Sequence, residues 1–520
     1  MPLVPLKMSA AQLDRALAAM ARVVGRDQVF AAEDDRRSYR DAYGPSHRSD
    51  HQPAAAVAPQ STEELQALLR IANEHKLPLW PISRGKNLGY GGTAPVLSGS
   101  VVLDLSRMKR ILEVDVKSNY CLLEPGVSFF DLYQHLTDNK LPLWMSVPAN
   151  SWGSVVGNAL ERGIGYTPYG EHTDRICGLE VALPSGELLR TGMGAMSGNK
   201  AWRSYKYGFG PAWDQMFVQS NFGVVTKMGL WLMPEPESTL TMQFELDEPQ
   251  DLVWALDLLG ELRMRRVIDS HVTIGTPLRT ASLFTQRSEW YSGPGAVPDA
   301  VVREMAKKYG VGWWTFAIRL FGYEEVNQAN ARIIKAAFGK HSTREFKEST
   351  WRRGEPLPRA AVQVPTTFFL QAVNWHGGRG GHMGFSPMLP HGGEGAYAQY
   401  LRTKQRFDEF GIDYYGGFTL AERYATNVNI VLYDRDQRDM TDRAYRMIDQ
   451  LVKDTAQAGY SEYRAHLSFM DGVAETYDFN HHAMRRLNQT VKDALDPNGI
   501  LAPGKSGIWP RRFRASKETT

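Results

Sequence analysis

The sequence predicts an α+β protein with two large domains, and three observations lead to that prediction. Residues 61–105 read as a helix, a strand, a glycine-rich loop and a second strand, in that order. Pro234-Glu-Pro236 then interrupts any regular element, because proline is poorly tolerated inside helices and central strands. Beyond this point helical patterns alternate with β-like runs. This texture indicates a second domain in which helices cover an antiparallel sheet.

Composition and charge favour a globular protein and argue against two kinds of partner. Of the 520 residues, 43% are hydrophobic and 22% are charged, which supplies ample apolar material for large cores. Length alone suggests about three domains, although domains of about 200–250 residues are common. The net charge of +3 is too small to favour binding to nucleic acid or to an anionic membrane.

Cysteine usage and the N-terminus bear on the compartment. The two cysteines, Cys121 and Cys177, cannot form a disulfide framework and do not lie in a C-x-x-C pair, which fits a reducing compartment. Residues 1–7 lack the apolar run of a signal peptide. No stretch approaches the roughly 18 consecutive apolar residues of a transmembrane helix. We therefore expect a cytoplasmic protein without a membrane partner.

The first part of the chain carries clear signals for helices, strands and a hairpin. Residues 11–24 have the apolar spacing of an amphipathic helix. Ser61-Thr-Glu-Glu64 has the spacing of a capping box and begins a helix that ends before Pro78. We expect strands at 77–80 and 100–105, and a hairpin over 181–189 with Pro184-Ser-Gly186 in its turn.

The glycine-rich loop Pro81–Gly92 is the stretch on which the functional interpretation depends. Glycines at 85, 89, 91 and 92 let backbone N–H groups turn toward one point and let a ligand approach closely, which suits a pyrophosphate. The loop matches neither G-x-x-x-x-G-K-[S/T] nor G-x-G-x-x-G. An ordinary glycine-rich turn is the alternative. Tyr90, a large aromatic residue among small ones, favours a ligand-facing loop instead.

Beyond Pro236 the expected helices and strands alternate. Helical patterns cover 251–266, 325–338, 394–410 and 440–458. β-like runs cover Trp313–Phe321, Phe368–Val373 and Val428–Tyr433. We find no internal repeat and no low-complexity segment.

Seven stretches, in the expected order, carry a resemblance to a known family. They are Pro81–Gly92, Gly153–Asn158, Gly165–Gly170, Ser220–Lys227, Gly381–Pro387, Glu462–Arg464 and Asp496–Gly507. With them the chain resembles, over nearly its whole length, the vanillyl-alcohol oxidase family, which also contains eugenol oxidase and the flavoprotein subunit of p-cresol methylhydroxylase. The resemblance implies the two-domain FAD-binding fold of the vanillyl-alcohol oxidase (PCMH) type. It implies an FAD-binding domain at 1–237, a substrate cap domain at 238–460, and a C-terminal segment at 461–520 that returns to the first domain.

The resemblance also implies where FAD binds. The candidate residues come from the loop, from two further small-residue stretches and from the C-terminal segment: Pro81, Ser83, Arg84, Gly85, Lys86, Asn87, Leu88, Gly89, Gly91, Gly153, Ser154, Gly157, Asn158, Gly223, Val225 and Lys505. For Gly223-Val-Val225, a plain buried strand is the alternative. His382 stands where this family's covalent flavin-linking histidine stands, and a neutral imidazole can attack the flavin's 8α-methyl carbon. A histidine with only a surface or core role is the alternative.

Tyr90, Tyr463 and Arg464 match the family residues that bind the phenol oxygen as phenolate. Two hydroxyl donors and a guanidinium favour the charged form and lower the pKa of the bound phenol. The ionised hydroxyl pushes electron density into the ring and assists departure of a benzylic hydride to flavin N5. The alternative for Tyr463 and Arg464 is a strand pair with a buried salt bridge.

Three further residues match family positions near the substrate: Tyr166, Glu171 and Arg423. Tyr166 is expected to line the cavity, and Glu171 takes a carboxylate position. Glu422 and Asp174 read better as solvated surface charges.

Two departures from the family pattern affect the chemistry. Where the oxidases carry an aspartate near flavin N5, thought to aid the covalent bond and to act as a base, this chain has Ala149. Where they carry R-E-M-H-H, it has Arg423-Tyr-Ala-Thr-Asn427. The first change removes an aid to the covalent bond and the base of the product-forming step, and the second implies that the substrate end of the pocket has been rebuilt.

The resulting hypothesis is an FAD-dependent oxidase of para-substituted phenols that works through a p-quinone methide, with O2 as electron acceptor. The substrates would be 4-alkylphenols, 4-hydroxybenzylic alcohols or eugenol-like and vanillyl-alcohol-like aromatics. One alternative is a dehydrogenase that passes electrons to a cytochrome or another acceptor, and a different class is a non-catalytic flavin- or aryl-binding protein. We expect a homodimer or higher homo-oligomer. No metal site is expected, since the histidines and cysteines lack ligand spacing.

Overall fold

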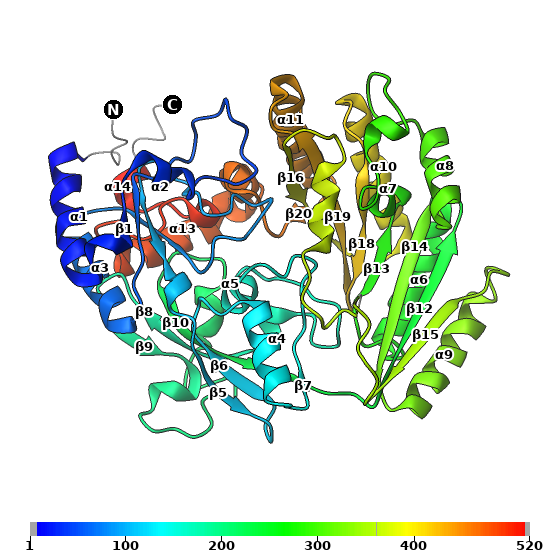
Figure 1. Ribbon diagram of the computed structural model, residues 1–520, viewed down its shortest axis with the longest axis horizontal. Helices are drawn as coiled ribbons and strands as arrows, with labels where there is room; N and C mark the ends of the chain where they lie inside the picture. Colours follow the sequence, from blue (N-terminus) through cyan, green and yellow to red (C-terminus); the bar gives the residue numbers. More distant parts are fainter. Residues whose placement is uncertain (1–7, 360, 515–520) are drawn as a thin grey trace.

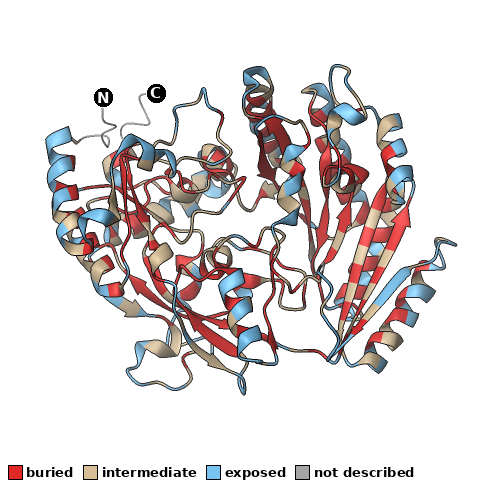
Figure 2. Ribbon diagram, in the orientation of Figure 1, coloured by how far each residue is buried: buried red, intermediate tan, exposed pale blue. Residues whose placement is uncertain are grey.

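The computed structural model describes residues 8–359 and 361–514. Figure 1 shows two lobes side by side, the first formed by the early and the last parts of the chain and the second by its middle. Figure 2 shows that the strands of both lobes are mostly buried, whereas the outer sides of the helices are exposed. The predicted α+β class is confirmed. We keep the division at 1–237, 238–460 and 461–520 as a proposal.

The first lobe begins with a mixed four-stranded sheet of order β1-β2-β4-β3. Strands β2, β3 and β4 are parallel, and β1 is antiparallel to β2. Two amphipathic helices pack on this sheet through Leu13, Leu17, Leu65 and Leu68. The elements are α1 (Ala10–Val24), β1 (Val29–Phe30), α2 (Glu33–Arg37), β2 (Ala55–Val57), α3 (Thr62–His75), β3 (Leu79–Ile82) and β4 (Val101–Asp104).

Helix α3 starts where the sequence predicts, but only half of the capping box forms. The hydroxyl of Ser61 accepts from the N–H of Glu64, 3.2 Å away. The Glu64 carboxylate, however, accepts from the N–H of Gln60 instead of that of Ser61. Strand β3 begins at Leu79, two residues later than predicted. The N–H of Leu79 donates to Ile500 (2.6 Å), and that of Ala502 donates to Leu79 (2.8 Å), so the strand pairs with the returning C-terminal segment.

A five-stranded antiparallel sheet of order β5-β6-β10-β8-β9 completes the first lobe. The predicted hairpin at 181–189 is confirmed, because β8 and β9 pair antiparallel, with Glu180 opposite Arg190 and Ala182 opposite Leu188. The elements are β5 (Ile111–Asp115), β6 (Tyr120–Leu123), α4 (Phe129–Asp138), β7 (Leu143–Trp144), α5 (Val155–Leu160), β8 (Ile176–Ala182), β9 (Leu188–Arg190), β10 (Val224–Trp231) and β11 (Met233–Pro234). After the second lobe, α12 (Met470–Glu475) still packs on the second-lobe core through Val473, and α13 (Phe479–Leu495) and α14 (Arg511–Arg514) return to the first lobe.

The second lobe is built on a nine-stranded sheet whose pairings are all antiparallel. Its strands are β12 (Ser238–Leu246), β13 (Val272–Gly275), β14 (Trp314–Gly322), β15 (Lys347–Arg352), β16 (Gly380–Phe385), β17 (Pro387–Pro390), β18 (Tyr415–Leu420), β19 (Tyr424–Asp434) and β20 (Ser461–Glu462). Its helices are α6 (Leu252–Met264), α7 (Pro277–Ala281), α8 (Asp299–Tyr309), α9 (Glu324–Phe338), α10 (Gly393–Glu409) and α11 (Arg438–Gln457). The four helices and two of the three strands predicted here are confirmed.

Successive side chains of each strand point to opposite faces of this sheet, so the two faces have different roles. In β14, Phe316 and Ile318 are fully buried in the core formed with helices α6, α9, α10 and α11. The alternate residues, including Ala317 and Arg319, are less buried and lie on the opposite face. That face supplies side chains to the site described below.

The predicted strand at Phe368–Val373 is wrong, because the structure has a 3₁₀ helix over Phe368–Asn374. A short apolar run is compatible with either structure, since periodicity cannot separate them. Phe369 contacts the rings of His382 (6.0 Å between centroids) and Tyr415 (6.3 Å) instead of entering a sheet. Throughout the described ranges, no helix combines the length and the apolar character needed to cross a bilayer.

Candidate active site

A cavity of about 360 Å³ lies between the two lobes. The first lobe contributes the glycine-rich loop, the start of α5 and part of β10. The second contributes the inner face of β18 and β19, and the C-terminal segment closes the cavity near Ala502 and Lys505. Residues far apart in the sequence therefore meet at one place.

The glycine-rich loop follows β3 and needs its glycines for space and for conformation. Gly89 has φ of +84°, and a Cβ there would lie 2.3 Å from the His382 ring. Gly91 has φ of +103°, and a Cβ there would lie 1.7 Å from Leu467. Neither glycine is among the residues that line the cavity. They instead let the loop lie against the second lobe and the C-terminal segment.

The structure brings most of the predicted loop residues to the cavity. Those that line it are Pro81, Ser83, Gly85, Lys86, Asn87, Leu88 and Tyr90. Arg84 does not, because its guanidinium donates to the carbonyl of Gly126 (3.1 Å) and lies 3.5 Å from the Asp131 carboxylate. Prediction from sequence assigned Arg84 to the cofactor, whereas its side chain is directed at the first turn of α4.

The second small-residue stretch lies directly beside the loop. Ser154 caps α5, since its hydroxyl accepts from the N–H of Gly157 (3.0 Å). A Cβ at Gly157 would lie 2.3 Å from the Ser83 hydroxyl, so glycine permits the close approach of the two segments. The predicted residues Gly153, Ser154, Gly157, Asn158, Gly223, Val225 and Lys505 all line the cavity. Lys505 also forms a 2.6 Å ion pair with Glu161.

His382 lies in β16 with only 4% of its surface exposed. Both of its ring nitrogens are buried and have no hydrogen-bond partner. Its ring lies 5.0 Å from that of Tyr43, centroid to centroid. Burial lowers the pKa of His382 to about 4, with Asp41 opposing this effect and His466 adding to it. The imidazole is therefore neutral near pH 7, with a free nitrogen lone pair beside the cavity.

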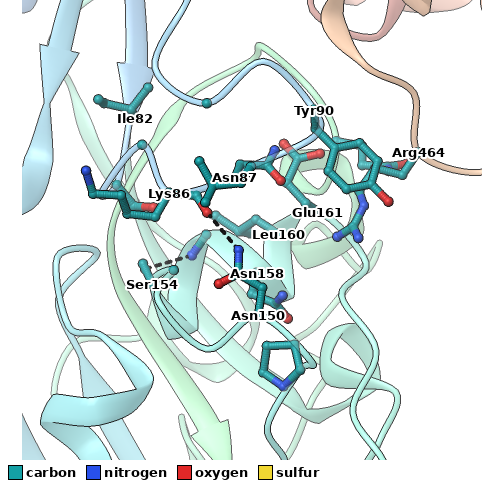
Figure 3. A pocket seen from close by; sticks show the side chains of 18 of the residues that line it. Ile82, Lys86, Asn87, Tyr90, Asn150, Ser154, Asn158, Leu160, Glu161 and Arg464 are labelled. Atoms are coloured by element: carbon teal, nitrogen blue, oxygen red, sulfur yellow. Dashed lines mark hydrogen bonds between the residues drawn. The ribbon is translucent and has the colours of Figure 1, made fainter. Parts of the chain in front are cut away.

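Tyr90, Tyr463 and Arg464 converge on the cavity from two distant parts of the chain. The Arg464 guanidinium lies 4.3 Å from the ring centroid of Tyr90 and 5.5 Å from that of Tyr463, and Figure 3 shows Tyr90 beside Arg464. Burial opposes the charge of Arg464, but attraction to Tyr463 and Tyr90 raises the pKa of the guanidinium above its ordinary value. Within residues 8–359 and 361–514, Arg464 forms no ion pair with a carboxylate, unlike the buried salt bridge of the alternative interpretation.

A buried carboxyl group lies just behind this cluster. Glu462 is 5% exposed, and its two oxygens lie 2.9 and 2.8 Å from the N–H of Ser386, which donates to them. Burial raises the pKa of Glu462 to about 8, against the opposing influence of Ser386 and Arg464.

The other predicted substrate residues have separate fates. Tyr166 lines the cavity, but Glu171 and Arg423 do not. Glu171 accepts hydrogen bonds from Tyr424 and from His271 Nε2, the latter at 2.9 Å. Arg423 lies in the turn between β18 and β19 with 75% of its side chain exposed, 3.7 Å from Glu422. The tight turn that joins the end of β18 to the start of β19 directs Arg423 away from the cavity.

Several lining residues were not predicted as site residues. They include Asn150, Asn221, Arg279, Phe369, Tyr415, Val428 and Ile430. Most belong to the second lobe, where the partner strands decide which side chains face inward. The spacing of Val428 and Ile430 on one strand puts both on one face, but the sequence does not reveal which face meets the first lobe.

Comparisons with known proteins agree with this arrangement. The FAD binding domain family matches residues 53–192, and the C-terminal domain of FAD linked oxidases matches residues 368–506. The 4-cresol dehydrogenase [hydroxylating] flavoprotein subunit of Pseudomonas putida is 37% identical over 514 residues, 97% of each chain.

Two solved structures are similar over almost the whole chain. The 4-ethylphenol oxidase from Gulosibacter chungangensis, in complex with isoeugenol, has a TM-score of 0.94 at 35% identity. The match covers 98% of this chain and 100% of the oxidase chain. A p-cresol methylhydroxylase with substrate bound has a TM-score of 0.93 at 36% identity. The match covers 98% of this chain and 99% of the methylhydroxylase chain.

Proposed function

The chain belongs to the family of FAD-linked oxidoreductases that includes the 4-cresol dehydrogenase flavoprotein subunit and 4-ethylphenol oxidase, and from this membership we propose that it oxidises para-substituted phenols at the benzylic carbon. It is a flavoenzyme with the PCMH-type FAD-binding fold, and FAD is its cofactor. When bound, FAD accepts the benzylic hydride through N5. The substrates we propose are 4-alkylphenols, 4-hydroxybenzylic alcohols and eugenol-like or vanillyl-alcohol-like aromatics.

The residues beside the cavity fit FAD. Because Gly157 has no side chain, the Ser83 hydroxyl packs directly against its backbone, and the two segments lie close enough for backbone N–H groups of both to face a pyrophosphate. Lys86 supplies positive charge nearby, and Lys505 lines the same cavity as an ion pair with Glu161. His382 offers an unpartnered ring nitrogen on a neutral imidazole. We propose that this nitrogen carries the covalent bond to FAD.

The convergence of Tyr90, Tyr463 and Arg464 is the observation that carries the proposed reaction. A guanidinium beside two hydroxyl groups, without a carboxylate partner, is suited to an incoming anion. We propose that the three residues hold the substrate as phenolate. The negative charge then raises the electron density of the ring and favours hydride loss, which leaves a p-quinone methide.

The electron acceptor is the second part of the proposal. We propose O2, as in the oxidase among the relatives. The dehydrogenase relative is described as a flavoprotein subunit, so a second protein as acceptor is the alternative.

Flavin bleaching tests both parts. Under nitrogen, 4-ethylphenol should bleach the flavin absorbance, and admitted air should restore it. Recovery only after a cytochrome is added would favour the dehydrogenase alternative. Binding of phenols without any bleaching would instead indicate a non-catalytic flavin- or aryl-binding protein.

Arg464→Ala tests the role of the phenolate. Loss of a charge-assisted partner costs about 1.5–3 kcal/mol, so flavin reduction should slow by at least roughly tenfold. Arg265→Ala is the matched control, because Arg265 is 69% exposed and pairs with Glu261. The methyl ether of the same phenol should not bleach the flavin, and equal rates for phenol and ether would disprove the mechanism.

A further inference from the structure

Two neighbouring arginines of the second lobe, one of which lines the cavity, have no acidic partner among the described residues. Arg279, on α7, lines the cavity beside Tyr415, and its Nη1 donates to the carbonyl of Ile274, at 3.4 Å. Arg319, on β14, lies behind it, and its Nη1 is buried with no hydrogen-bond partner. In the described part of the chain neither forms an ion pair. By contrast, Arg263 in the same lobe has Asp269 and Glu422 within electrostatic reach.

The charge of Arg279 makes the charge of Arg319 harder to bury. The pKa of Arg319 is lowered to about 10, chiefly by burial, with Tyr166 opposing this effect and the Arg279 charge adding to it. Burial raises the pKa of Tyr415 to about 12, and Arg279 opposes that rise. Buried cations are ordinarily paired, because an unpaired charge in a protein interior is strongly unfavourable. Only Arg279 of the two lines the cavity, and a cation there with no carboxylate partner among the described residues indicates that an anion enters it.

Tyr166 connects this end of the cavity with the phenolate cluster. It lies within electrostatic reach of Tyr463 on one side and of Arg319 and Tyr415 on the other. Val428 and Ile430 line the same cavity and give it an apolar wall. A substrate bound by Arg464 at one end thus has an apolar passage and a second cationic group available for its other end.

We propose that the preferred substrates are para-substituted phenols whose side chain ends in a carboxylate, and that Arg279 binds this carboxylate while Arg319 adds a second positive charge behind it. A guanidinium matches a carboxylate with two parallel hydrogen bonds, and little water competes inside the cavity. This inference rests on the proposed phenol oxidation and specifies its substrate class.

The simplest such substrate is 3-(4-hydroxyphenyl)propanoate. Its benzylic carbon loses a hydride and the neighbouring carbon loses a proton, which gives 4-hydroxycinnamate. The hydride and the proton reduce FAD to its two-electron reduced form, so atoms and electrons balance. The carboxylate takes no part in the bond changes and stays with Arg279.

The test compares acids with neutral isosteres on the FAD-loaded enzyme. We expect kcat/KM for 3-(4-hydroxyphenyl)propanoate to exceed that for its amide by at least roughly tenfold, the effect of one charge-assisted hydrogen-bonded pair. Arg279→Gln should reduce this acid-to-amide ratio to near one. Arg319→Lys, which keeps the charge, should retain most of the ratio. Arg265→Gln, which removes an exposed charge of the same lobe, should leave the ratio as in wild type.

A binding measurement separates recognition from turnover. 4-Hydroxycinnamate has no benzylic hydride to lose, so calorimetry with the FAD-loaded enzyme should show it binding at least roughly tenfold more tightly than 4-vinylphenol. An acid-to-amide ratio near one in wild type would overturn the inference, as would equal binding of the two analogues. If 4-ethylphenol is oxidised while acids are not preferred, only the substrate class is wrong. If no phenol bleaches the flavin, the proposed function itself fails.

Discussion

Gly384 leaves room for the hydroxyl group of Tyr90, because a Cβ on Gly384 would lie 2.9 Å from that oxygen. The N–H of Gly384 also donates to the carbonyl of Gly89, at 3.3 Å. Strand β16 and the glycine-rich loop therefore contact each other through their backbones. The position of Tyr90 depends on the absence of a side chain at Gly384, in the other lobe.

Gly384→Ala should displace Tyr90 without removing it. Overpacking typically costs about 1–3 kcal/mol, so flavin reduction by 4-ethylphenol should slow by about tenfold or more while FAD content is retained. Gly472→Ala is the matched control, because a Cβ on Gly472 meets nothing within 4 Å. Stopped-flow reduction rates of both variants decide the matter, and a wild-type rate for Gly384→Ala would contradict this role of the contact.

His382→Ala should release FAD from covalent attachment. Acid precipitation of the fully loaded wild type should leave yellow colour in the pellet, whereas the variant should lose its colour to the supernatant. The neutral imidazole with two unpartnered nitrogens is the physical reason. If acid frees all flavin from wild type, the linkage does not form, and the alanine at position 149 is the first place to look.

Ala149→Asp should change the products. Ala149 lines the cavity where the oxidases carry a carboxylate, so no anion there can take a proton from water that attacks the quinone methide. We expect wild type to convert 4-alkylphenols to more alkenylphenol than alcohol. General-base assistance is worth about 10²–10⁴-fold, so the aspartate should shift the ratio visibly toward alcohol. Product analysis of both enzymes on one substrate tests this. An alcohol-dominated mixture from both would mean that the base lies elsewhere, although neither Glu171 nor Asp174 lines the cavity.

Glu462 should make stability fall with rising pH. Its pKa is 4.5 without perturbation and about 8 in the folded protein, so between these values the folded state holds a proton that the unfolded state has lost. The stabilisation is fully present below pH 4.5 and is lost as the pH rises toward about 8. Glu462→Gln should flatten this dependence. Thermal unfolding of both proteins across the window measures it, and parallel curves would show that Glu462 does not titrate there.

The sequence predicts residues whose role follows from their immediate neighbours in the chain, and it misses residues whose place at the cavity is set by the packing of distant elements. The glycines of the loop and the cap at Ser61 follow from backbone requirements that the sequence displays. Arg84 and Arg423 have suitable charges, but neighbouring elements direct them elsewhere. Arg279 and Tyr415 carried no local signal, because their place at the cavity is set by the pairing of β13, β14 and β18. The apolar run at Phe368 was misread because periodicity alone does not separate a short strand from a helical turn, and Phe369 packs on His382 and Tyr415 of its own lobe.

The return of the chain to its first lobe sets an order of events during synthesis. Leu79 pairs with Ile500 and Ala502, and Lys505 lines the cavity. The last strand of the second lobe ends earlier, at Glu462. A growing chain can therefore complete the second lobe before the residues that close the cavity have left the ribosome. Until residues 500–502 arrive, β3, the strand that leads into the glycine-rich loop, lacks this pairing partner, and we expect the cofactor to be loaded only after that pairing forms.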